Sequence, residues 1–269
     1  MDIKVGLKSK WTFDQLDTRI FNKLDLIEIY LDYQDLEKRL DLIEENLRFL
    51  KEKHKNISIT IHQPEKFKDN FLNLASLDFD ILNNTYECLH ILSQLADRYN
   101  LGGVIIHPYW SEDEKYKNDN VCNADKAERL ISNLKNISQY KNIIFLENEI
   151  SGCFSFYKDI LNVLEKTEFR LALDFCHLRI ASKNNKEFIK NVDKLGSHIS
   201  YCHLSDTKGV QDDAMELGKG VINWCELVKY IKIALIEVEE KDYINIPKML
   251  NSFNYFKKIC YQNTISKAK

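Results

Sequence analysis

The feature that most restricts the fold of this chain is an eightfold alternation of short apolar runs with longer segments that can hold a helix. Several runs are rich in β-branched residues or alternate apolar with polar residues, as strands do. The clearest segment between runs, residues 36–50, spaces its leucines and isoleucine by three and four, as an amphipathic helix does. The predicted strands cover residues 3–7, 26–32, 57–64, 102–107, 142–149, 171–174, 199–204 and 234–240. The predicted helices cover residues 11–24, 36–50, 80–99, 124–137, 156–164, 188–195, 222–233 and 246–261.

Strands that alternate with helices predict a parallel sheet, because parallel neighbours need long crossover connections. Eight strand–helix units in 269 residues match a closed (β/α)8 TIM barrel, an α/β fold formed here as a single domain over residues 1–269. The competing fold is an open doubly wound sheet, which normally carries a glycine-rich phosphate loop after its first strand. No such loop follows residues 3–7. We therefore expect the barrel.

Composition bears on partners and cellular setting. The net charge of −3 shows no basic excess, which disfavours a nucleic-acid partner, although a local basic patch could still exist. The seven cysteines are odd in number and never spaced CxxC, which favours a reduced chain over a disulfide framework. No signal-peptide core and no membrane-spanning run of about 18 apolar residues occurs. We expect a cytoplasmic protein without a membrane partner; homo-oligomers remain open.

Metal-binding residue types stand at the ends of the predicted strands. A single histidine or carboxylate there is usually a hydrogen-bonded, capping or solvated group. In a barrel, however, all these ends face one mouth, where several carboxylates would repel one another unless a cation neutralised them. Mixed imidazole and carboxylate donors suit Zn, Mn, Fe or Co, so a divalent metal site is the main hypothesis. The strand-end residues are Glu28, His62, His107, Glu147, Asp174, His203 and Glu237.

Further candidates lie just beyond the strands. His177 follows Asp174 by three residues and could be a ligand, a substrate hydrogen-bond donor or a helix cap. Asp206 fits a structural role in ordering its loop, and Lys208 is the best cation for a phosphate or oxyanion, unless it is simply solvated. Asp212 adds a carboxylate before the LGKG turn. Supporting or solvated carboxylates are Glu149 and Glu239, and aromatic residues for cavity walls or helix packing are Trp11, Tyr30, Tyr109, Trp110 and Trp224.

Together, these residues resemble the xylose isomerase-like TIM barrels, a group that includes endonuclease IV and sugar-phosphate isomerases and epimerases. The resemblance covers nearly the whole chain, and its order of ligands (His, His, Glu, Asp-x-x-His, His, Asp, Glu) agrees with that group. Its most specific parts are IIFLENE, LALDFCH, YCHLSD followed by LGKGVINW, and ALIEVEE.

The resemblance implies a set of site roles. In the epimerase branch, the metal ligands correspond to Glu147, Asp174, His203 and Glu237; the two glutamates also exchange protons with the substrate, and His177 corresponds to a substrate-binding histidine. The endonuclease branch adds a second metal at His62 and His107, bridged by Glu147. Its third metal uses His177, Asp212 and a histidine whose position is Ala214 here. That departure leaves a third metal one ligand short.

Three functions follow from these observations. The first is a metal-dependent isomerase or epimerase of a small sugar or sugar phosphate, with Zn, Mn or Co as cofactor, Glu147 and Glu237 as catalytic carboxylates, and His177, Lys208 and Asp212 as substrate contacts. The second is an endonuclease IV-like enzyme that cleaves DNA at abasic sites, disfavoured by Ala214 and by the acidic loop at residues 111–120. The third is a non-catalytic binding protein, disfavoured by the intact ligand set.

Overall fold

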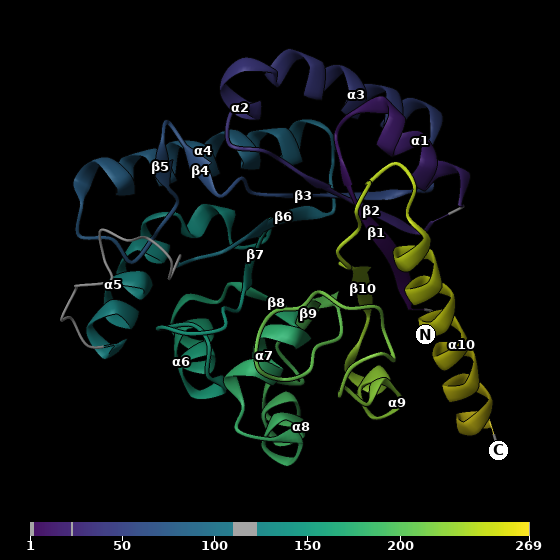
Figure 1. The fold of residues 1–269 in the computed structure, drawn as a ribbon. Helices are drawn as coiled ribbons and strands as arrows, with labels where there is room; N and C mark the ends of the chain where they lie inside the picture. Colours follow the sequence, from purple (N-terminus) through teal and green to yellow (C-terminus); the bar gives the residue numbers. More distant parts are fainter. Residues whose placement is uncertain (1–2, 23, 110–122, 269) are drawn as a thin grey trace.

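The computed structural model describes residues 3–22, 24–109 and 123–268, and they form a closed parallel barrel surrounded by helices (Figure 1). The predicted TIM barrel is thus confirmed. The order of strands around the barrel is β1-β10-β9-β8-β7-β6-β3-β2. The barrel strands are β1 (Lys4–Lys10), β2 (Leu26–Tyr30), β3 (Ser58–His62), β6 (Gly103–Ile106), β7 (Ile144–Glu147), β8 (Arg170–Asp174), β9 (Ile199–Leu204) and β10 (Ile233–Ile236).

Helices cover the outside of the barrel and pack their apolar faces on the strands (Figure 1). They are α1 (Phe13–Phe21), α2 (Asp35–Lys38), α3 (Leu40–Lys53), α4 (Phe79–Arg98), α5 (Asn123–Asn136), α6 (Tyr157–Thr167), α7 (Phe175–Ala181), α8 (Asn185–Leu195), α9 (Trp224–Leu227) and α10 (Pro247–Ala268). Two 3-10 turns, η2 (Ser138–Tyr140) and η3 (Val228–Tyr230), and a hairpin of β4 (Lys66–Phe67) with β5 (Asn70–Phe71) complete the described chain.

The inside of the barrel is divided into an apolar layer and a polar layer above it. Side chains on a strand alternate between its two faces, so every second residue points inward. The apolar layer is a buried cluster separate from the core between strands and helices, formed by Leu26, Ile105, Phe145, Ala172, Tyr201 and Leu235. Two residues further along the chain from these members stand Glu28, His107, Glu147, Asp174, His203 and Glu237. The alternation therefore places the titratable groups in the layer nearer the mouth.

The structure differs from the prediction in local detail. The helix predicted over residues 36–50 breaks at Arg39 into α2 and α3. The helix predicted over 222–233 is only α9 followed by η3, because Ile233 is already the first residue of β10. Helix α7 and the β4–β5 hairpin were not predicted. α7 forms directly at the strand end because the Asp174 side chain caps it, accepting the backbone N–H of His177 at 2.7 Å.

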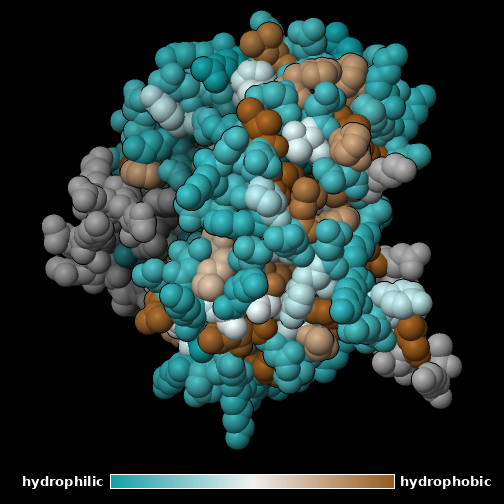
Figure 2. Space-filling model, turned by 45° about the vertical axis from the view of Figure 1, so that its right-hand side comes forward, coloured by the Kyte–Doolittle hydropathy of each residue, from teal (hydrophilic) through white to brown (hydrophobic). Residues whose placement is uncertain are grey.

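The surface is mostly hydrophilic on the face that Figure 2 presents, where apolar side chains lie in small groups among polar ones. Among the described residues, no helix has both the length and the apolar character required to cross a membrane.

Candidate metal centre

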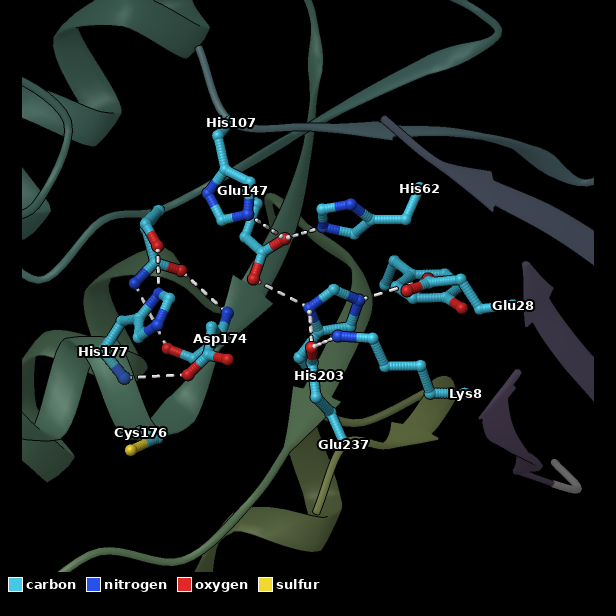
Figure 3. Close-up of polar contacts among 12 residues, drawn as sticks. Lys8, Glu28, His62, His107, Glu147, Asp174, Cys176, His177, His203 and Glu237 are labelled. Carbon is cyan, nitrogen blue, oxygen red and sulfur yellow. Dashed lines mark hydrogen bonds and ion pairs between the residues drawn. The ribbon is translucent and has the colours of Figure 1, made fainter. Parts of the chain in front are cut away.

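The carboxyl ends of the strands enclose a cavity of about 220 Å³ at the mouth of the barrel. Figure 3 shows that the polar side chains around it come from different sides of the barrel and point toward one another. Of the seven strand-end residues, five line this cavity, whereas Glu28 and His203 are fully buried beneath it. The lining residues are Lys8, Tyr30, His62, Gln63, Glu65, His107, Glu147, Asp174, His177, Ser205, Asp212, Ala214 and Glu237.

Glu147, the last residue of β7, connects the polar groups of the cavity. Its Oε1 lies 2.8 Å from His203 Nδ1, and its Oε2 lies 3.1 Å from His62 Nε2 and 3.5 Å from His107 Nε2. Burial acts to raise the pKa of this carboxyl, but the charges of His203 and His107 outweigh burial and hold the pKa well below its usual value. Glu147 is therefore ionised and shared by two groups of donors.

The first donor group consists of Glu147, Asp174, His203 and Glu237, whose donor atoms lie within 4.8 Å of one another. His203 Nδ1 faces both glutamates, at 2.8 Å from Glu147 Oε1 and 3.0 Å from Glu237 Oε2. Asp174 is buried at the end of β8, and burial raises its pKa to about 7 against the lowering effect of His177. Three carboxylates around one imidazole form a donor set suited to a divalent cation.

The second donor group consists of His62, His107 and Glu147, again within 4.8 Å. Both histidines have a hydrogen-bond partner on the nitrogen far from Glu147: His62 Nδ1 donates to Gln63 O at 2.9 Å, and His107 Nδ1 lies 2.8 Å from Glu149 Oε1. Burial lowers the pKa of His107, but the carboxylates of Glu147 and Glu149 outweigh it and raise the pKa to about 9.

Lys8 is a cation of this cavity that was not predicted from the sequence. Its ammonium forms an ion pair with Glu237 and lies 4.4 Å from the centre of the Tyr30 ring. Burial lowers the pKa of Lys8, but Glu237 outweighs burial and raises the pKa above its usual value. Lys208, in contrast, is exposed; its backbone N–H donates to Asp213 Oδ2 at 3.2 Å, and it does not line the cavity. The structure does not bring Lys208 to the site.

His177 and Asp212 meet at the edge of the cavity. His177 Nδ1 donates to Asn148 O at 2.8 Å, and its Nε2 lies 3.4 Å from Asp212 Oδ2. Asp212 Oδ1 accepts the backbone N–H of Ala214 at 3.2 Å. Burial lowers the pKa of His177, but the negative charges of Asp174 and Asp212 raise it well above the usual value. The pair can offer a proton donor to a ligand, whereas the methyl group of Ala214 supplies no third metal donor.

Asp206 organises the loop after β9, in agreement with the structural role predicted for it. Its buried carboxylate accepts four hydrogen bonds at distances of 2.9–3.3 Å. The donors are the backbone N–H groups of Thr207, Gly218 and Ile222 and the indole Nε1–H of Trp224. The LGKG turn is thereby folded against β9, and a β-carbon at Gly220 would lie only 2.2 Å from Asp206 Oδ1.

The aromatic candidates divide between wall and core. Tyr30 lines the cavity, whereas Trp11, Tyr109 and Trp224 are buried members of the core between strands and helices. Trp110 and the acidic loop at residues 111–120 lie outside the described residues. Of the two supporting carboxylates, Glu149 contacts His107, and Glu239 is exposed.

Residues 22–239 match the family described as xylose isomerase-like TIM barrels. The chain belongs to this family. Two relatives with sequence similarity are uncharacterized proteins of Methanocaldococcus jannaschii. MJ1311 is 23% identical over 248 residues, which cover 85% of this chain and 80% of the relative. MJ1614 is 25% identical over 248 residues, which cover 89% of this chain and 93% of the relative.

Several solved structures superpose on nearly the whole chain. A D-tagatose 3-epimerase-like protein has a TM-score of 0.76 at 20% identity and covers 99% of this chain and 100% of its own. Endonuclease IV of Thermus thermophilus has a TM-score of 0.70 at 13% identity, with 96% and 99% covered. The IOLI protein, described with a bound zinc atom, has a TM-score of 0.70 at 15% identity, with 96% of both chains covered. At these identities, the similarity shows the fold alone.

The donors of this xylose isomerase-like barrel fit a divalent metal ion. Both donor groups combine imidazole nitrogen with carboxylate oxygen, the mixture typical of Zn, Mn, Fe or Co sites. In each of the three histidines, the ring nitrogen that faces away from Glu147 has a hydrogen-bond acceptor, as is usual for histidines that bind metal. The acceptors are Gln63 O for His62, Glu149 Oε1 for His107 and Glu28 Oε2 for His203.

Of the two residues missed from the sequence, Lys8 has an identifiable signal and Asn148 has none. Strand β1 continues to Lys10, three residues beyond the predicted end at Leu7. Its inward positions therefore include Lys8, which pairs in register with Glu28. Asn148, between two glutamates of the IIFLENE run, exchanges two hydrogen bonds with the Asp174 backbone, at 2.8 and 3.2 Å, and so joins the ends of β7 and β8. No sequence pattern indicated this contact.

Proposed function

We propose that this chain is a metal-dependent isomerase or epimerase that acts on a small sugar or sugar phosphate by carboxylate-mediated proton transfer. The observation that carries the proposal is the placement of Glu147 and Glu237 on either side of His203 Nδ1, with both carboxyl pKa values held well below the usual range. Two ionised carboxylates from different strands can face one substrate and act on it from two directions.

Each group of the site has a task in this reaction. Glu147, Asp174, His203 and Glu237 would hold a divalent ion, which would supply polarisation of a substrate carbonyl or hydroxyl and so acidify the neighbouring C–H bond. One glutamate removes that proton, and the other returns a proton to the same or the adjacent carbon. His177, whose Nε2 faces the cavity edge beside Asp212, donates a hydrogen bond that orients a substrate oxygen. Lys8 holds Glu237 in place through its ion pair.

The size of the cavity supports a small substrate. At about 220 Å³, it lies below the roughly 300–1,000 Å³ of pockets for drug-sized ligands. It adjoins an open cleft of about 730 Å³, with which it shares Tyr30 and Glu65. That cleft is lined by four acidic residues and two basic ones: Asp32, Asp35, Glu65, Asp69, Arg39 and Lys66. Such a lining favours a polyhydroxylated molecule over the phosphates of DNA.

Hydrogen exchange at carbon tests the proposal. The metal-loaded protein is incubated in D2O with a panel of free and phosphorylated ketoses and aldoses, and proton NMR follows loss of C–H signal and appearance of the epimer or isomer. We expect exchange with at least one sugar, and its loss in Glu147→Gln and Glu237→Gln variants. Glu239→Gln is the matched control, because Glu239 is an exposed glutamate two residues from Glu237. Metal content is measured for each variant, so that loss of metal is distinguished from loss of a base. Exchange that survives in both site variants contradicts the proposal.

One observation favours endonuclease IV-like cleavage as the second candidate: His62, His107 and Glu147 form a complete second donor group. Two metals can stabilise the attacking and leaving oxygens of a phosphodiester. Ala214 argues against a third metal, and the acidic cleft argues against DNA. We therefore expect no metal-dependent nicking of abasic-site duplex DNA. Efficient nicking that disappears in a His107→Gln variant would reverse the ranking of the two candidates.

A further inference from the structure

Glu28 is a buried carboxylate that the proposed reaction leaves without a task. It lies in the middle of β2, is 0% exposed, and is not among the lining residues of the cavity. Its Oε2 lies 3.1 Å from His203 Nε2, and His203 is also 0% exposed. Its Oε1 has no hydrogen-bond partner among the described residues. The charge of Glu28 also acts on Lys8 and Tyr201, and both of their pKa values are raised. Figure 3 shows Glu28 on the side of the His203 ring opposite to Glu147.

A carboxylate in this position is costly. Burial of an ionised group is unfavourable by several kcal/mol unless a partner compensates it, and replacement of a buried ion pair by apolar residues is often neutral or stabilising. The neighbouring inward position on β3, Thr60, is a neutral residue, which shows that this layer of the barrel accommodates uncharged side chains. A role of Glu28 in orienting the His203 ring accounts for a carboxyl group at this costly position.

We propose that Glu28 is a positioning residue for the metal centre: it accepts the Nε2–H of His203 and thereby leaves Nδ1 as the nitrogen that faces Glu147 and Glu237. An imidazole that donates from Nε2 presents its lone pair at Nδ1, which is the nitrogen 2.8 and 3.0 Å from the two glutamates. His62 and His107 are held by acceptors on Nδ1 and use Nε2 toward Glu147, so His203 is the reversed case. Because Glu28 accepts the Nε2–H, it favours the His203 tautomer that is protonated on Nε2 and has its lone pair on Nδ1. The inference rests on the proposed metal site.

The competing assignment is a separate metal held by Glu28, His62 and His203, whose donor atoms also lie within 4.8 Å of one another. That site would need His203 Nε2 as a ligand. With Nε2 bound to that metal, Nδ1 could bind a second metal in the cavity only if the imidazole lost both of its N–H protons. The two assignments therefore differ in which nitrogen of His203 binds the metal, and this difference can be measured.

The experiment measures metal affinity and the tautomer together. Competition with a chromophoric chelator gives the Kd for Zn²⁺ and Co²⁺, and nitrogen-15 NMR of the imidazoles identifies the protonated and the metal-bound nitrogen of His203. We expect about 100-fold weaker binding for Glu28→Leu and about 10-fold weaker binding for Glu28→Gln, whose amide oxygen can still accept the Nε2–H. The control Thr60→Val, an isosteric change in the same layer, should stay within about threefold, because Thr60 bonds Tyr201 and not His203.

Each outcome is decisive. Support requires metal on Nδ1 and a proton on Nε2 in the wild-type protein, together with the ranked loss of affinity. Wild-type affinity in Glu28→Leu, or metal on Nε2, overturns the inference and leaves the proposed function standing. A wild-type protein that binds neither ion overturns the metal centre and this inference with it. If Glu28→Leu does not fold, the wild-type tautomer and the Glu28→Gln affinity still decide.

Discussion

Metal uptake by this site should release protons, and the affinity should therefore rise with pH. Ligating nitrogens and carboxylates must be unprotonated, so protons compete with the metal. In the metal-free protein, the pKa of His107 is raised to about 9, because Glu147 and Glu149 outweigh burial, and burial raises the pKa of Asp174 to about 7. The pKa of His203 is likewise raised well above its usual value. At neutral pH, both histidines therefore carry a proton that a metal ion must displace.

The magnitude follows from the distance of each pKa from the working pH. A pH of 7 lies about two units below the pKa of His107, so only about 1% of the His107 side chains are unprotonated. The competing proton therefore weakens metal binding at the second donor group about 100-fold, which corresponds to roughly 2.7 kcal/mol. Each unit of pH below about 9 should change that affinity about tenfold. At the first donor group, binding should release about half a proton from Asp174 at pH 7, and His203, whose pKa is raised well above its usual value, should add to the release.

Isothermal titration calorimetry with Zn²⁺ and Co²⁺ tests this prediction. Titrations from about pH 6 to about pH 8 in two buffers of different ionisation enthalpy give both the affinity and the number of protons released. A His107→Gln variant should lose the second ion together with its proton release, and the first ion should keep its own pH dependence. An affinity that stays constant over this range, or heats that do not depend on the buffer, would refute the charge states inferred for the two histidines.

Three further predictions concern stability. Lys8→Met should lower the free energy of unfolding of the metal-free protein by about 2 kcal/mol, because it removes the ion pair with the partly buried Glu237 carboxylate and leaves His203 as its charged partner. The same change should tighten metal binding by removing a competing cation, and urea melts with and without metal check both signs. Asp206→Ala should cost about 3 kcal/mol or more, since four donors lose their acceptor, and Asp206→Asn should recover part of the loss in the same melts. His107, whose pKa is raised from 6.5 to about 9, contributes stability that is fully present below pH 6.5 and lost as pH rises through about 9; wild-type thermal melts, compared with His107→Gln, measure it.

The barrel itself could be predicted because the two kinds of periodicity are strong and mutually consistent. Strand runs buried on both faces and helices that space their apolar residues by three and four leave few alternative folds. The boundaries were less certain where one residue satisfies two patterns. Ile233 continues the apolar spacing of the preceding helix and also begins β10 as a partner of Lys4 in β1, and the pairing in the sheet decides between the two.

The part of the site that could be predicted consists of the side chains at the carboxyl ends of the strands. Strand-end histidines and carboxylates meet because every parallel strand delivers its last inward residue to the same mouth. Loops have no such rule, so Lys208 could not be placed and proved to be exposed. Lys8 was missed for a different reason. The predicted strand ended at Leu7, whereas β1 runs on to Lys10 and directs Lys8 inward, where it pairs with Glu237 just after the neighbouring strand β10.

The charges of the cavity imply that the barrel folds without the metal ion that the proposed chemistry would use. In the metal-free protein, Lys8 pairs with Glu237, and the proton on His203 pairs with Glu147, so the carboxylates are compensated without an ion. This differs from structural zinc sites, whose ligands do not assemble without metal. Removal of metal with a chelator should therefore abolish turnover while the circular dichroism spectrum and a cooperative thermal transition persist, and added Zn²⁺, Mn²⁺ or Co²⁺ should restore activity. Unfolding on chelation would show that the metal ion is needed to compensate the carboxylates of the cavity, and that Lys8 and the proton on His203 do not suffice.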